Sequence, residues 1–380
     1  MNNQPLFSNL RLRSRLNQCL HIKRFLKGKG KIKVSLNQEV SPNDVIAVYE
    51  ISGGFTSINL ARELNLSPQI ADKNLTRKIG STFFRGELLA SKKSLFGQNF
   101  LTAPTDGVLE NYNPKTGELR IKFLPKEVEL TAGVFGVIDQ LDPEKGEILI
   151  RTMVTEIFGV LGTGSEKSGH LSVIAGNGDL VNASRITESH REKIVVAGAL
   201  VLGEALRKAF SLGLKGLISG GINLSDYSAL AGSIYGEKKI DTEIGFSVLV
   251  TEGFGLIPLG MDIYKIAREN EGNFVFLNGD RSTLILPSPD PNSILSIRKI
   301  RLPIPTFAKT VLEKEVAELK VGSKVRVVWP PFMGAQGEVL AIDQTPTRLE
   351  SGIFTFMVTL ELQNQKLKVP YTNVEIIQDF

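Results

Sequence analysis

Glycines and acidic side chains follow three apolar segments in the middle of the chain. These residues and their polar neighbours are Gly220, Gly221, Asp226, Thr251, Glu252, Gly253, Gly255, Asp280 and Arg281. In an open α/β sheet, ligands bind beyond the carboxyl ends of the strands, where glycine lets a ligand approach the backbone. Glu252, Asp226 and Asp280 together would bind a cation or a sugar. Glycine also ends strands in plain turns, so the pattern predicts either a small-molecule pocket or ordinary turns.

A second glycine-rich segment, GTGSEKSGH at residues 162–170, has the residue types of a phosphate-binding loop without its spacing. With Lys167 and Ser168 as the Lys-Ser pair, Glu166 and Leu161 stand where the two glycines of that motif belong. The HLSVIAGN segment that follows predicts a strand, whereas a phosphate loop needs a helix N-terminus there. A serine hydrolase would need G-x-S-x-G or an equivalent oxyanion hole, which the segment lacks. It is interpreted as a surface loop.

The chain has three histidines and one cysteine, Cys19. One cysteine cannot form an internal disulfide or a thiolate zinc site, and three dispersed histidines argue against a multi-histidine metal centre. We therefore expect no metal and no cofactor. The low cysteine content is typical of a reducing compartment, and neither a secretory signal nor an apolar window of about 18 residues occurs. A cytoplasmic protein without a membrane span is expected.

Basic residues are concentrated at the start of the chain. Nine of the 45 Lys and Arg residues precede Glu39, the first of the 40 acidic residues, and the formal net charge is +5. Unopposed Lys and Arg bind phosphates by displacing condensed counterions. Residues 1–29 are therefore interpreted either as a basic arm that contacts RNA or the ribosome or as a solvated, frayed terminus. The candidate contacts of the arm are Arg11, Arg13, Arg15, Lys23, Arg24 and Lys27.

The middle of the chain alternates between helix and strand patterns. Residues 202–212 carry an apolar stripe at helical spacing, and further short helices are expected at 225–234 and 262–270. Apolar runs that end in glycine predict strands between them, including residues 246–252. This β-α-β-α-β order over residues 151–300 predicts an open, largely parallel α/β sheet.

The regions on either side of this α/β core are mainly β. Residues 30–150 contain short strand patterns separated by turn residues, with a helix-like insertion at roughly 56–78. Proline-rich residues 301–318 predict a linker, and residues 319–380 again contain short strand patterns. The sequence thus predicts a multidomain chain of class α/β plus β.

Two halves of the first β region are loosely alike: GKIKVSLNQEVSPNDVIAVYE at residues 30–50 and RGELLASKKSLFGQNFLTAPTDGVLENY at residues 85–112. They contain the segments NDVIA at residues 43–47 and APTDGV at residues 103–108. With these residues the region resembles the lipoyl-like, or barrel-sandwich hybrid, family. The resemblance implies one barrel-sandwich-like domain over residues 30–150. Carrier members of the family present a modifiable lysine at the place of ISGG, residues 51–54, where this chain has none. A scaffold without a lipoyl or biotinyl arm is therefore implied.

The last β region contains VRV at residues 325–327 and PFMGAQGEV at residues 331–339. With these residues it resembles the KOW family, the small SH3-like barrels of NusG-type elongation factors and of certain ribosomal proteins. Members bind RNA, ribosomal protein or polymerase through loops of the barrel, which makes Arg326, Trp329, Phe332 and Arg348 candidate contacts by resemblance. The alternative is a barrel that packs on its own neighbouring domain, and exposure of the aromatic residues would favour a partner.

Three functional hypotheses follow. The first is a non-catalytic binding or adaptor protein that contacts RNA, the ribosome or the transcription machinery through the KOW-like barrel and the basic arm. The second is a small-molecule-binding enzyme or sensor with its site at the glycine loops of the α/β domain. The third is a structural subunit of a protein assembly. The sequence does not predict an oligomeric state.

Overall fold

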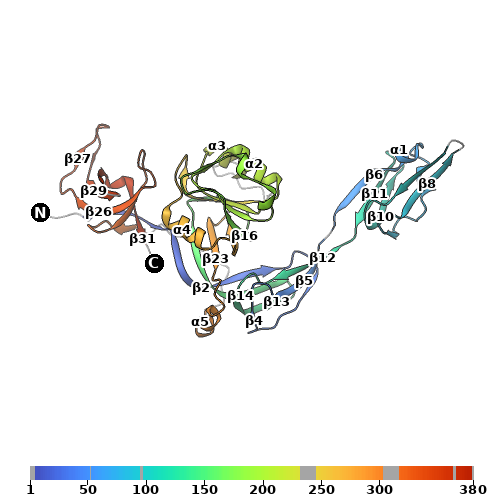
Figure 1. Cartoon of the computed structure of the whole chain (residues 1–380), viewed down its shortest axis with the longest axis horizontal. Coiled ribbons are helices and arrows are strands. Elements are labelled where there is room, and N and C mark those ends of the chain that lie inside the picture. Colours follow the sequence, from blue (N-terminus) through green and yellow to red (C-terminus); the bar gives the residue numbers. More distant parts are fainter. Residues whose placement is uncertain are drawn as a thin grey trace.

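The computed structural model describes residues 5–51, 53–94, 97–231, 245–302, 316–362 and 365–378. Strands dominate its regular structure and form several sheets, which confirms the expectation of a β-rich chain. Figure 1 shows an elongated molecule, with a C-terminal sheet at one end, a helix-flanked sheet in the middle and a narrow β unit at the far end. Within the described residues, no helix is long and apolar enough to cross a membrane.

The N-terminal strands belong to two different sheets. Strand β1 (Phe7–Leu12) lies between β24 (Val316–Glu318) and β31 (Val374–Gln378) of the C-terminal sheet. Strand β2 (Ser14–Phe25) pairs along most of β14 (Glu147–Phe158). The alternative of a solvated, frayed terminus over residues 1–29 is therefore wrong for these strands. Leu10 packs into the C-terminal core, and Leu20, Ile22 and Leu26 pack into the core of the first β region, which anchors the segment.

The first β region contains two separate cores. The base unit is built by β2, β14 and five further strands: β3 (Gly30–Ile32), β4 (Glu39–Val40), β5 (Val45–Ile51), β12 (Lys126–Thr131) and β13 (Gly136–Asp142). Its core includes Ile46 and Ala47 of the NDVIA segment, whereas Ala103 of the APTDGV segment packs in the other core. The two loosely alike halves that contain these segments thus do not share one hydrophobic core, as a single domain over residues 30–150 would require.

The second of these cores forms a distal unit, seen at the far end of the molecule in Figure 1. It consists of β6 (Phe55–Asn59), α1 (Leu60–Leu64), the 3-10 turn Ala71–Asn74, β7 (Thr82–Phe83), β8 (Leu88–Ser94), β9 (Gly97–Thr102), β10 (Gly107–Asn113) and β11 (Glu118–Phe123). The helical residues of this unit lie within the expected insertion. The chain enters after β5 and returns at β12, which pair with each other in the base unit.

The middle unit contains four parallel strands: β16 (Lys167–Val173), β18 (Ile194–Val196), β20 (Gly216–Ile222) and β21 (Ser247–Phe254). The short strands β17 (Leu180–Val181) and β19 (Leu200–Val201) pair with each other, and β19 also pairs with β20. Strand β15 (Leu161–Thr163) lies antiparallel to β21 at one edge of the sheet. On the other side, β22 (Phe274–Asn278) and β23 (Thr283–Pro287) connect β16 to β14. The base and middle units therefore share one continuous sheet.

Helices cover both faces of the middle sheet. Helix α2 (Gly203–Ser211) buries Ala205, Leu206 and Ala209 in the core on one face, where α3 (Leu224–Ala231) also packs. Helix α4 (Met261–Glu269) buries Ile263 and Ala267 on the other face. The remaining helical pieces are α5 (Ser293–Lys299) and the 3-10 turns Ala183–Arg185 and Glu188–His190. The end of the helix expected at 225–234 lies outside the described residues.

The C-terminal sheet has the order β24-β1-β31-β25-β26-β29-β30. Its other strands are β25 (Lys324–Val327), β26 (Gln336–Ile342), β29 (Met357–Leu362) and β30 (Gln365–Pro370), with a β27 (Thr347–Arg348) and β28 (Phe354–Thr355) hairpin and the 3-10 turn Tyr371–Asn373. Alternating Val325 and Val327 point into its core. Most of the expected linker, residues 303–315, lies outside the described residues.

Candidate functional site

A buried network of ion pairs lies where the N-terminal strands, the middle sheet and the C-terminal sheet meet. Arg13, between β1 and β2, donates from Nη1 and Nη2 to the two carboxylate oxygens of Glu252 at 3.1 and 2.8 Å. Its Nε and Nη2 also donate to Asp262 of α4 at 2.6 and 3.0 Å. The side chains of Arg13 and Glu252 are each 1% exposed. Such a two-point geometry fixes both partners in orientation as well as in distance.

The C-terminal sheet joins the same network through Arg326 of β25. Its Nη2 lies 2.7 Å from Oε2 of Glu252 and donates to the Glu252 carbonyl at 2.9 Å, while Nη1 donates to Glu375 at 2.6 Å. Gln336 of β26 adds a hydrogen bond to Asp262 at 3.2 Å. One carboxylate, that of Glu252, is therefore held by arginines from two other parts of the chain.

The network keeps its carboxylates charged. Burial raises the pKa of Glu252, but the hydrogen bonds and charge of Arg13 and the charge of Arg326 outweigh it, so the pKa lies below its ordinary value. The same balance, again dominated by Arg13, holds the pKa of Asp262 below its ordinary value. Burial would lower the pKa of Arg13, but its hydrogen bonds to Asp262 and Glu252 raise it. The network is therefore a set of ionised partners that lock the units together.

A groove with a volume of about 730 Å³, lined mostly by apolar residues and glycines, runs directly beside this network. One wall is the segment Phe254 to Met261, which links β21 to α4, and the other is the segment Pro330 to Gln336, which links β25 to β26. The walls approach each other closely, because a Cβ added to Gly334 would lie 3.0 Å from the side chain of Ile257. We call this feature the interdomain groove.

Large apolar side chains at the interdomain groove are exposed. Leu256 is 62% exposed, Met261 60% and Phe332 42%, and all three line the groove. Trp329, the only tryptophan, precedes the lining residue Pro330 and is 63% exposed. The C-terminal sheet does pack on the neighbouring middle unit through Arg326 and Gln336, and Trp329 and Phe332 stay exposed beside that contact. Arg326, which the KOW resemblance also suggests as a contact, is instead buried in the ion-pair network.

The space beside the glycines at the end of β20, Gly220 and Gly221, is filled by another segment of the chain. A Cβ added to Gly220 would lie 2.2 Å from the carbonyl oxygen of Ile257, and one on Gly221 would lie 1.9 Å from that of Gly255. The hypothesis that these two glycines admit a ligand is therefore wrong, since the β21–α4 segment already fills the space. Gly253 and Gly255 have φ values of 144° and 104° and allow that segment to fold back. Gly255 also lines the interdomain groove.

The three acids expected to form one cluster are apart. Both carboxylate oxygens of Glu252 are paired with Arg13 and Arg326. Asp226 on α3 accepts a hydrogen bond from Asn223. Asp280 accepts from the backbone of Gly164, near the start of β21, whereas Glu252 lies near its end. Among the described residues, no group of three or more His, Cys, Asp or Glu is placed to hold a metal ion. A cation site built from these acids is thus contradicted.

The remaining sequence candidates lie outside the groove lining. Thr251 donates to Glu252 at 3.2 Å and is buried, so it supports the network, and Arg281 is exposed after β22. Arg348 is exposed on the β27–β28 hairpin. Of the residues that the sequence suggested for a ligand pocket or a partner contact, only Gly255 and Phe332 line the interdomain groove.

The basic residues of the expected arm have mostly internal partners. Arg11 donates to the carbonyl oxygens of Phe158 and Thr251, and burial lowers its pKa. Arg24 lies over the rings of Phe274 and Phe276 and donates to the Thr131 carbonyl. Lys23 pairs with Glu147, and Arg15 lies over the ring of Phe158. Lys27 is exposed. Arg11, Arg13 and Arg24 are thus held within the chain, whereas Arg15 and Lys27 are exposed, so the six residues do not form one continuous basic surface.

Comparison with protein-family models and with curated proteins finds no match for this chain. Its function is therefore inferred from the interdomain groove itself.

Proposed function

We propose that this protein is a non-catalytic binding or adaptor protein that docks an uncharged, apolar segment of a protein partner in the interdomain groove. The observation that carries this proposal is the set of exposed apolar side chains on two walls that belong to different sheets. Leu256 and Phe332, one from each wall, represent the two halves of the docking surface. Contiguous exposed apolar surface of this kind is typical of protein interaction sites.

Charge favours a protein segment over RNA as the occupant. Among the residues that the structure describes, the groove lining contains no Asp, Glu, Lys or Arg. RNA binding needs cations opposite the phosphates, and the nearby Arg13 and Arg326 are already held by carboxylates. An apolar segment loses no ion pairs on entering such a groove and gains the free energy of burying its side chains.

The ion-pair network prepares the groove for binding. Gly260, which lines the groove, donates its backbone N–H to Glu252 at 3.1 Å, and Gln336 of the opposite wall donates to Asp262. Both walls are therefore held by carboxylates that share Arg13 as a partner. A preformed site needs less ordering on binding, so more of the contact energy appears as affinity.

The fold types inferred for the C-terminal and middle units are compatible with an adaptor. We infer that the C-terminal unit is a KOW-like, SH3-like fold and that the middle unit is an open α/β core. The resemblance of residues 325–339 and the parallel pairing of β16, β18, β20 and β21 support these assignments. The KOW resemblance points to partners among ribosomal or transcription proteins. In that assembly the interdomain groove would bind a protein component.

The proposal is tested by site-specific photo-cross-linking of the full-length protein. A benzophenone amino acid replaces Leu256 in the groove or, as the control, Leu295, which is 57% exposed on α5. Both variants are irradiated in extract of the native cell with and without nuclease treatment, and the cross-linked partner peptide is identified by mass spectrometry. That peptide is then synthesised and titrated into the wild-type protein while the fluorescence of Trp329 is followed.

We expect one nuclease-resistant adduct from position 256 that is absent from position 295. The synthetic peptide should shift the emission of Trp329 to shorter wavelength as the ring becomes buried, and Phe332→Ser should weaken binding by about tenfold or more. The proposal is overturned if the adduct disappears with nuclease, if both positions give the same adducts, or if the peptide does not bind.

A further inference from the structure

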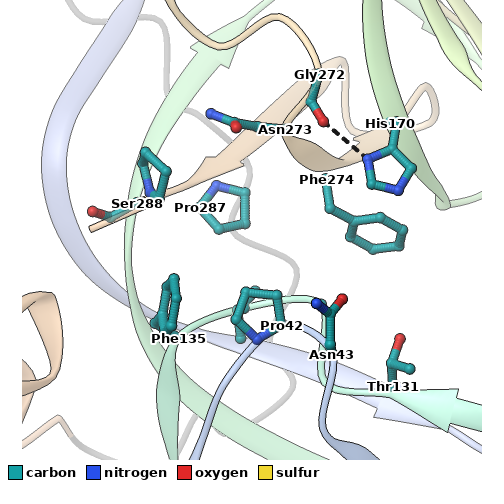
Figure 2. Close-up of a pocket in the computed structure, with 13 residues that line it drawn as sticks. Pro42, Asn43, Thr131, Phe135, His170, Gly272, Asn273, Phe274, Pro287 and Ser288 are labelled. Atoms are coloured by element: carbon teal, nitrogen blue, oxygen red, sulfur yellow. Dashed lines mark hydrogen bonds between the residues drawn. The ribbon is translucent and has the colours of Figure 1, made fainter. Parts of the chain in front are cut away.

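A second cavity, of about 340 Å³, lies between the base unit and the middle unit, away from the interdomain groove. Figure 2 shows Pro42, Asn43 and Phe135 of the base unit on one side and Asn273, Phe274 and Pro287 of the middle unit on the other. Small-molecule sites are commonly found between domains and begin at about this size. We call this cavity the junction pocket.

The walls of the junction pocket are held by backbone hydrogen bonds from both units. Gly133 donates to the Pro42 carbonyl at 2.8 Å, which joins the two base-unit loops. Gly272 donates to Leu171, and Leu171 donates to Asn273, each at 2.9 Å. These bonds fix the start of β22 against β16. The pocket is therefore formed by segments that the sheet already holds in place.

Aromatic packing gives the pocket a rigid ring surface. The ring of Phe274 packs edge-to-face on His170 and on Phe276, with centroids 5.5 and 5.6 Å apart. Gly133 has a φ of 76°, and a Cβ there would lie 2.9 Å from Phe274. A glycine at this position thus lets the Phe274 ring pack directly against the backbone. Phe135 and Pro42 supply further ring surface across the pocket (Figure 2).

The polar groups that line the pocket come from Asn, Thr, Ser and His side chains and from the backbone. None of the thirteen lining residues is Asp, Glu, Lys or Arg. His170 places Nδ1 3.0 Å from the Gly272 carbonyl, which can only accept, so Nδ1 carries the proton. The amide of Asn43 rises toward the Phe274 ring (Figure 2). An amide offers a donor and an acceptor side by side, which matches the edge of a nucleobase.

We propose that the junction pocket binds an uncharged heteroaromatic ligand of nucleoside size. The base would stack on the ring of Phe135, contact Phe274, over which Arg24 already lies, and exchange hydrogen bonds with Asn43. Flat bases are recognised by this combination of apolar faces and edge-directed hydrogen bonds. Among the described lining residues there is no cation, and Arg24, which lies over Phe274 behind the lining, already donates to the Thr131 carbonyl, so the free nucleoside is preferred over a nucleotide or an RNA strand.

The three histidines allow a direct test on the full-length protein. Their imidazole C2–H resonances are followed by proton NMR while adenosine, guanosine, cytidine or uridine is added, and His170→Gln assigns the signal of the pocket. His21 lies against Asp139 and His190 on its own 3-10 turn, so both serve as internal controls. We expect at least one nucleoside to shift the His170 signal saturably and to leave the other two unchanged.

Two variants decide whether the ligand occupies the pocket as described. Asn43→Leu and Phe135→Ala should each weaken nucleoside binding by about tenfold, since each removes a hydrogen-bonded edge or a stacking face. Asn111→Leu, at an exposed position in the distal unit, is the matched control and should bind as wild type. The proposal is overturned if no nucleoside shifts the His170 signal, if both pocket variants bind normally, or if a mononucleotide or an oligonucleotide binds more tightly than the nucleoside.

Discussion

Arg13 and Glu252 lie 239 residues apart in the sequence and form a two-point ion pair that is almost completely buried. Because Arg13 joins β1 to β2, this pair ties the C-terminal sheet and the base unit to the end of β21. Arg326 binds the same carboxylate from β25. The position of the C-terminal sheet, and with it the shape of the interdomain groove, therefore depends on Glu252.

Removal of one partner of this pair should destabilise the protein strongly. Arg13→Ala leaves the buried Glu252 and the half-buried Asp262 without their main cation, so we expect a loss of about 3–5 kcal/mol in the free energy of unfolding. Lys265→Ala removes an exposed pair with Glu269 and should cost about 1 kcal/mol or less. Urea denaturation of both variants checks this. Equal effects would show that the network contributes no more than a surface pair.

Stability should fall in acid because of the same carboxylates. The folded-state pKa values of Glu252 and Asp262 lie below those of the unfolded chain, so the unfolded state binds protons first as the pH falls. The contribution is complete above about pH 5 and is lost as the pH drops through and below about 4. Thermal unfolding of wild type and Glu252→Gln from pH 7 to pH 3 measures it. The difference in unfolding free energy should be constant near neutrality and narrow in acid; a constant difference throughout contradicts the prediction.

The N-terminal segment shows why residue composition alone does not reveal that these residues form paired strands. Its nine cations without an acid are typical of a phosphate-binding tail, because the partners of Arg13 are hundreds of residues away in the sequence. One local signal did point to a strand. Leu20 and Ile22 alternate with polar residues, and both contribute to the base core. Period-two alternation predicts a strand even where charge suggests disorder.

Helices and strands with strong local patterns were predictable, whereas contacts between units were not. The stripe at residues 202–212 contains α2, and residues 262–270 overlap α4. Leu256 and Gln336 carried no signal as site residues, since their roles depend on how the C-terminal sheet lies against α4. Gly220 gave a misleading signal, because a glycine that admits a ligand and one that admits the chain's own backbone have the same sequence pattern.

That last distinction is directly testable. Gly220→Ala places a Cβ 2.2 Å from a backbone oxygen, so the β21–α4 segment must move, and we expect a loss of about 1–3 kcal/mol or more in stability. Gly178→Ala is the control, since its Cβ would meet nothing within 4 Å. Thermal and urea unfolding should separate the two. A Gly220→Ala protein as stable as wild type would mean that the segment yields easily and that space beside Gly220 is available after all.

The distal unit should be removable without loss of the rest of the fold. Phe55 and Lys122 are partners across β6 and β11, so the two ends of the unit are separated by roughly 5 Å, a gap that a short Gly-Ser linker can close. Its core is separate from that of the base unit, where β5 and β12 continue the pairing at Ile51 and Lys126.

We therefore expect a protein that lacks residues 55–122 to unfold cooperatively near the wild-type temperature and to keep the emission spectrum of Trp329. Since independent cores unfold independently, calorimetry of the full chain should resolve a separate transition that the deletion removes. If the shortened protein is instead unfolded, the distal core contributes to the stability of the base unit. The continuous sheet of the base and middle units would then not be self-sufficient.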